Sequence, residues 1–155
     1  RTALGMDDGK RYDILNALAA QGHEDALRDG EHLSVLTAFC GTREDPTSLG
    51  AVTGISEANF TPQALAAGVL FGMAEELYRM YDALPHGHIT ALAASGNAIR
   101  KNPALQAILS DVFEMPVSVA AAEEEAAFGA AMTAAAGVGL KSASDLVRWV
   151  RYRET

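Results

Sequence analysis

The sequence has a single cysteine and lacks the features that mark secreted and membrane proteins. Cys40 cannot form a disulfide within the chain, so we expect a reducing compartment and place the protein in the cytoplasm. We expect Cys40 to be a buried structural thiol rather than a nucleophile, because no base stands near it in sequence. No secretory signal and no apolar run long enough to span a bilayer are present, so no membrane partner is expected.

Basic residues are also few. Twelve Lys and Arg stand against twenty Asp and Glu, for a formal net charge of -8. Apart from a small group at Arg148, Arg151 and Arg153, the basic residues are scattered, so a face that binds nucleic acid is not expected. A length of 155 residues, 49% of them hydrophobic and 21% charged, is typical of one globular domain. Because the chain starts with Arg1 rather than Met, we expect it to be a piece of a longer protein.

The most informative stretch is His88–Phe113. Ile89–Ala94 is nearly all apolar, which predicts a strand buried on both faces. Ser95–Asn97 then interrupts it with a glycine, which can adopt backbone angles closed to other residues. Asn102 is a good N-cap and Pro103 a good first residue for the apolar-striped helix that follows. A strand that leads through small residues into a helix leaves its backbone open to a ligand beyond the carboxyl end of the strand.

The first half of the chain predicts a short helix followed by two strands. A helical pattern follows Asp7 and ends at Gly22. We interpret His23–Asp25 as a solvated loop rather than a metal site, because no second cluster of ligands stands at a matching spacing. Residues 33–39 and 52–55 predict strands.

The longest helix is predicted to begin at Thr61 and Pro62. Gly68 and Gly72 lie four residues apart on it and each costs about 1 kcal/mol relative to Ala, which predicts close packing against another element. Met73 and Met80 are expected to fill gaps in the core.

The last third of the chain predicts one more strand and two helices. Residues 116–120 predict the strand, and Glu123–Glu125 stand at the front of the next helix, where negative charge suits the helix dipole. Small residues in Ala126–Ala136 would let this helix lie close to a sheet or another helix. Ser142 opens a short final helix. The alternation of strands and helices predicts an α/β domain.

Four segments in series carry a resemblance to a known family. They are a G-x-R-x-x-P loop in Phe39–Pro46, a long helix around Leu65–Glu75, a strand–turn–helix in Ala94–Phe113 and an E-x-x-x-G-A-A helix start in Glu125–Ala131. In order and spacing they resemble the C-terminal lobe of FGGY carbohydrate kinases, over about residues 32–140. The sequence looks closest to the sedoheptulokinase- and xylulokinase-like branch.

The resemblance implies an α/β fold, the C-terminal lobe of the actin-like ATPase (ribonuclease H-like) fold, with a mixed sheet flanked by helices. It also implies transfer of the γ-phosphoryl group of MgATP to a sugar such as sedoheptulose or xylulose. Ser95, Gly96 and Asn97 match the adenosine motif, with Ser95 in place of a more usual glycine. Asn102 matches an asparagine near the adenine if one residue is inserted, and helix capping is its other reading.

The resemblance also implies what this chain does not carry. The catalytic aspartate, the Mg²⁺ ligands and the N-terminal lobe are expected upstream, so the chain alone is expected to be inactive. We expect residues 1–155 to be one domain, with a peripheral helical segment at 1–31, a core at 32–140 and a C-terminal helix at 141–155. The expected partners are ATP and a sugar, with a homodimer as a further option. A nucleotide-binding regulatory module of the same superfamily, without transfer chemistry, is the alternative.

Overall fold

The computed structural model describes residues 8–153, which form two compact units. The first unit contains the described residues up to Gly87 together with Pro103–Glu114. The second contains His88–Asn102 and the described residues from Met115 onward. The division into segments 1–31, 32–140 and 141–155 stays a prediction.

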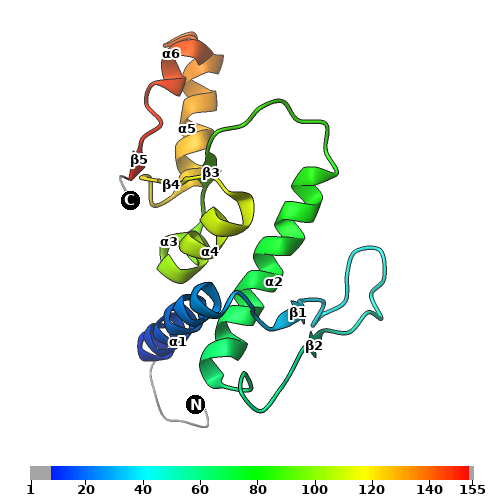
Figure 1. Cartoon of the computed structure of the whole chain (residues 1–155). Coiled ribbons are helices and arrows are strands. Elements are labelled where there is room, and N and C mark those ends of the chain that lie inside the picture. Colours follow the sequence, from blue (N-terminus) through cyan, green and yellow to red (C-terminus); the bar gives the residue numbers. More distant parts are fainter. Residues whose placement is uncertain (1–7, 154–155) are drawn as a thin grey trace. The chain divides into compact units, whose positions relative to one another are not determined.

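The first unit is built on three helices and a short hairpin (Figure 1). Its elements are α1 (Asp8–Asp29), β1 (Ser34–Leu36), β2 (Ala51–Thr53), α2 (Pro62–Asp82) and α4 (Pro103–Phe113). The strands β1 and β2 are antiparallel, with Val35 opposite Val52. α2 contacts α1, α4 and β1, so it is the central element of this unit. Phe71 of α2 and Ile108 of α4 are buried in its core.

The start of α2 and its close packing confirm the sequence-based prediction. Thr61 caps the helix by accepting a hydrogen bond from the Ala64 N–H at 3.1 Å. Gly72 lies against β1, and a Cβ at this position would overlap the carbonyl oxygen of Val35. A Cβ on Gly68 would lie 3.0 Å from the Leu33 carbonyl oxygen. The two glycines therefore allow the backbone of α2 to approach the β1 segment.

The predicted end of the first helix at Gly22 is wrong, because α1 continues to Asp29. Gly22 lies inside the helix where α1 crosses α2, and a Cβ there would overlap the carbonyl oxygen of Gln63. His23 is accordingly part of α1 rather than of a solvated loop, and it is buried. Its Nε2 lies 2.6 Å from Oδ2 of Asp111 on α4, which links the two helices.

Two expectations about burial are also wrong. Met73 and Met80 are 38% and 56% exposed, because the buried side chains of α2 are those of Ala67, Phe71 and Ala74. Cys40 is exposed, since it lies in the loop that follows β1 rather than in the core.

The second unit contains a three-stranded mixed sheet in the order β3-β4-β5, which confirms the predicted sheet type. β3 (Leu92–Ala94) is parallel to β4 (Val117–Ala120), with Leu92 opposite Val117. β5 (Tyr152–Arg153), which the sequence did not predict, is antiparallel to β4. The expectation that the strand before Ser95 is buried on both faces is wrong, because β3 is an edge strand of this sheet and Ala93 is exposed.

Three helices complete the second unit: α3 (Asn97–Arg100), α5 (Glu125–Gly137) and α6 (Ala143–Val147). α3 is a single turn that the sequence did not predict. α5 has no buried residue among those described, so the close packing expected of its small residues is not observed. Ser142 caps α6 by accepting from the Asp145 N–H at 3.2 Å. Within residues 8–153 no helix is both long enough and apolar enough to cross a membrane.

Candidate functional site

The candidate site begins where β3 ends, at the turn formed by Ser95, Gly96 and Asn97. Gly96 has φ 98° and ψ 160°, a backbone conformation that other residues rarely adopt. A Cβ built on Gly96 would meet no heavy atom of the described chain within 4 Å, apart from its chain neighbours. The turn is therefore open on the side where glycine lacks a side chain.

Arg100, the last residue of α3, connects this turn to the segment before α5. Its Nη1 donates to Oδ1 of Asn97 and to the carbonyl oxygen of Glu123, both at 3.0 Å. Its Nη2 donates to the carbonyl oxygen of Ala122 at 2.7 Å and to the carboxylate of Glu125. The Arg100 side chain is only 8% exposed, and each of its terminal nitrogens donates two hydrogen bonds. The guanidinium therefore has little donor capacity left for a ligand.

Glu125, the first residue of α5, makes the second link to the turn. Its Oε1 accepts a hydrogen bond from the Gly96 N–H at 3.1 Å and another from Arg100. The Gly96 N–H above all, then the backbone N–H of Glu125 itself and the Arg100 guanidinium, hold the pKa of Glu125 below its ordinary value. Glu125 is therefore a carboxylate at neutral pH.

A cavity of about 600 Å³ lies beside the turn within the second unit. Its size falls in the range of roughly 300–1,000 Å³ that is typical of small-molecule sites. Alanines of β3 and alanines at and just after the end of β4 line part of the cavity with small side chains. Phe128, Trp149 and Tyr152 provide larger apolar surfaces. Ser95, Glu125 and Arg151 add polar groups. The cavity thus combines flat apolar walls with a few polar side chains.

The four residues expected to contact nucleotide do not all lie in one place. Ser95 lines the cavity, whereas Gly96, Asn97 and Asn102 are not among the described residues that line it. Gly96 and Asn97 continue the same turn. Asn102 directly precedes α4, as expected of a capping residue, and its N–H donates to the Ile99 carbonyl oxygen at 3.2 Å.

Arg100 and Glu125 were missed as parts of this site. The sequence places Glu125 at a helix start, where its charge is favourable, and in the Glu125–Ala131 segment that resembles the family, but it assigns neither Glu125 nor Arg100 to the nucleotide site. Their contact joins residues 25 apart in sequence, so no helical or strand periodicity could have predicted it.

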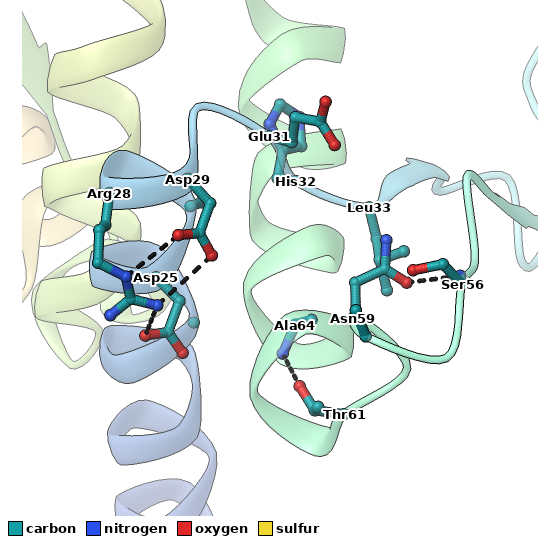
Figure 2. Close-up of a pocket in the computed structure, with 13 residues that line it drawn as sticks. Asp25, Arg28, Asp29, Glu31, His32, Leu33, Ser56, Asn59, Thr61 and Ala64 are labelled. Atoms are coloured by element: carbon teal, nitrogen blue, oxygen red, sulfur yellow. Dashed lines mark hydrogen bonds and ion pairs between the residues drawn. The ribbon is translucent and has the colours of Figure 1, made fainter.

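A second cavity, of about 290 Å³, lies in the first unit between the end of α1 and the start of α2 (Figure 2). Three of its charged groups are paired with each other, since Arg28 binds Asp25 at 2.9 Å and Asp29 at 3.1 Å. Asp29 first and Asp25 second raise the pKa of Arg28. The Asn59 side chain accepts from the Ser56 N–H at 2.7 Å. We therefore place the candidate site at the cavity beside Ser95, where the backbone is open.

Metal ligands are not grouped in the part of the chain that the structure describes. Residues 8–153 contain no set of three or more His, Cys, Asp or Glu side chains that could hold a metal ion.

Comparison with known proteins places the chain in a family. Residues 6–138 match the C-terminal domain of the FGGY family of carbohydrate kinases. A search of curated proteins gave no match. Among solved structures, the chain is similar to xylulose kinase from Rhodospirillum rubrum, with 28% identity and a TM-score of 0.72 over 95% of this chain and 29% of that chain.

Two further solved structures have the same fold at lower identity. Ligand-bound xylulose kinase from Lactobacillus acidophilus matches with 17% identity and a TM-score of 0.72, over 94% of this chain and 29% of that one. Gluconate kinase from Lactobacillus acidophilus matches with 17% identity and a TM-score of 0.73, over 99% of this chain and 31% of that chain. The chain thus spans less than a third of the length of these relatives, and its fold is the C-terminal lobe of the actin-like ATPase fold. Since the family match covers most of its length, the chain belongs to the FGGY family of carbohydrate kinases and corresponds to their C-terminal domain.

Proposed function

We propose that the protein containing this chain is an ATP-dependent carbohydrate kinase, and that the chain supplies the adenosine side of its ATP site. The observation that carries the proposal is the open Ser95–Asn97 turn at the carboxyl end of β3, with an apolar cavity beside it. In open α/β sheets, ligands bind beyond the carboxyl ends of the strands. Membership of the FGGY family supports the same assignment.

The chemistry of the cavity suits a purine nucleoside. Phe128 and Trp149 offer apolar ring surfaces, and the alanines leave room for a flat ligand. The exposed Asn97 uses its Oδ1 to accept from Arg100, which leaves its amide N–H groups to donate to an acceptor on the nucleotide. Asn102 completes the proposed set as a contact near the adenine.

The proposed second substrate is a ketose such as xylulose or sedoheptulose. The Rhodospirillum rubrum structure, which is 28% identical, is a xylulose kinase, and this supports a ketose. Phosphoryl transfer depends on positioning the reactants and on stabilising charge around the phosphates. We assign the general base and the Mg²⁺ ligands to the rest of the kinase, so the 155-residue chain alone should not phosphorylate a sugar.

Two assays test the proposal. ATP at about ten times its Kd should stabilise the chain by about 1.4 kcal/mol, seen as a raised midpoint of thermal unfolding. A phosphotransfer assay with a panel of ketoses should detect product with the full-length protein and none with the chain alone. No stabilisation by ATP would contradict the nucleotide site. Stabilisation without turnover of any sugar by the full-length protein would favour the regulatory module instead.

The homodimer and the cytoplasmic location stay predictions. Sedimentation equilibrium of the full-length protein would test the first, and imaging of the tagged protein in its own cells would test the second.

A further inference from the structure

We propose that Glu125 and Arg100 are positioning residues that hold the Ser95–Asn97 turn in its nucleotide-binding conformation. The inference rests on the proposed function, because it assigns these residues to the same ATP site. Neither residue lies among the four that the sequence assigned to nucleotide contact.

The turn needs an external restraint because of its own backbone. Gly96 has a φ of 98°, and a glycine can leave this conformation more easily than any other residue. The helix α3 that follows has only four residues and is too short to fix the turn by itself. The hydrogen bond from the Gly96 N–H to the Glu125 carboxylate supplies the restraint, and a charged acceptor makes it stronger than a neutral one.

Arg100 extends the restraint to the neighbouring strand. It donates to Asn97 on the turn that follows β3, and to the Ala122 and Glu123 carbonyl oxygens on the segment that follows β4. β3 and β4 are parallel neighbours, so the segments that follow them both begin at the carboxyl ends of these strands, on the same side of the sheet. Arg100 thereby joins the two segments that border the cavity, and its own side chain is largely buried between them.

The arrangement also limits what the turn can offer a ligand. The Gly96 N–H is already used by Glu125, so it is not available to a phosphate oxygen. Contact at Gly96 must therefore use the open Cα side, which suits a flat base or a ribose better than an anion. The Asn97 side chain is oriented by Arg100 in the same way, with its oxygen engaged and its amide nitrogen left to donate.

The test uses the whole 155-residue chain and two matched pairs of variants. Glu125→Gln removes the charge at the restraint, and Glu124→Gln removes a charge from the adjacent, exposed residue, whose side chain has no partner among the described residues. Arg100→Gln is paired with Arg148→Gln, which changes an exposed arginine at the end of α6. Calorimetric titration gives the Kd for ATP, and NMR hydrogen exchange gives the protection of the Gly96 amide without ligand.

We expect Glu125→Gln to raise the Kd for ATP by about tenfold, the effect of losing one charge-assisted hydrogen bond. Arg100→Gln, which removes the four hydrogen bonds of the guanidinium, should raise the Kd by at least as much. The Gly96 amide should exchange about tenfold faster in Glu125→Gln than in the wild type. Both control variants should leave the Kd and the exchange rate unchanged. A purely structural role would lower the folded fraction, and so the number of binding sites, while leaving the Kd of the folded molecules unchanged; that result would overturn the inference.

The remaining outcomes separate the inference from the proposed function. Equal exchange at Gly96 in wild type and Glu125→Gln would overturn the inference whether or not ATP binds. If the wild type does not bind ATP, the proposed function fails and the nucleotide role of these residues fails with it, while the exchange rates still show whether Glu125 holds the turn. If Glu125→Gln does not fold, Arg100→Lys, which keeps the charge but not the planar set of donors, replaces it and should raise the Kd.

Discussion

Replacing Gly72 with alanine tests the packing of α2 against β1. The new Cβ would overlap the carbonyl oxygen of Val35, a backbone atom that cannot rotate away. Overpacking of this kind costs about 3 kcal/mol at the upper end of its usual range. Alanine in place of glycine within a helix returns about 1 kcal/mol. The free energy of unfolding should therefore fall by about 2 kcal/mol, which lowers the melting temperature by about 4–8 °C in a chain of this size.

Two further glycines give matched comparisons for this variant. A Cβ on Gly68 would lie 3.0 Å from the Leu33 carbonyl oxygen, so its smaller cost should nearly cancel the helical gain. Gly129 on α5 has no heavy atom of the described chain within 4 Å of an added Cβ, so Gly129→Ala should stabilise by about 1 kcal/mol. Thermal unfolding followed by circular dichroism should give the lowest melting temperature for Gly72→Ala, a higher one for Gly68→Ala and the highest for Gly129→Ala. An unchanged or raised melting temperature for Gly72→Ala would refute the close approach of α2 to β1.

Three further predictions concern the turn and one helix start. Gly96→Ala should destabilise the protein by about 1–3 kcal/mol in urea denaturation, because φ is 98° there, and equal stability would contradict the turn conformation. The pKa of Glu125 is lowered in the folded state, so its ionised carboxylate contributes to the free energy of unfolding. This contribution is complete above the ordinary pKa of the group and is lost as the pH falls through the lower pKa of the folded state. Wild type should thus lose more stability than Glu125→Gln between about pH 5 and about pH 3, and parallel curves would refute the contact. Thr61→Ala should cost about 1 kcal/mol by removing the cap of α2, whereas Thr61→Ser should not, and an equal loss for both would argue against capping.

Local features of the fold were predictable because they depend on neighbouring residues. Thr61 and Pro62 mark the start of α2 through capping and a fixed φ, which both act within one turn. Gly68 and Gly72 predicted close packing without naming the partner. The same reasoning failed at Gly22, because a glycine at a helix crossing and a glycine at a helix end look alike in sequence.

The candidate site was predictable only in part, for a related reason. The turn after β3 follows from a run of apolar residues broken by Ser95 and Gly96, which are adjacent in sequence. The restraint on that turn comes from Glu125, which follows a second strand and reaches Gly96 only because β3 and β4 are neighbours. Contacts of this kind depend on the pairing of strands, which a single sequence does not specify.

A titration of the chain with ATP, followed by tryptophan fluorescence, shows whether nucleotide binds in the cavity beside Ser95. Trp149 is the only tryptophan of the sequence, and it lines the cavity beside Ser95. ATP bound in this cavity should produce a saturable change in the emission of Trp149, with the same Kd as calorimetry. Emission that stays constant while calorimetry detects ATP binding, or the absence of binding by both methods, would contradict a nucleotide site in this cavity.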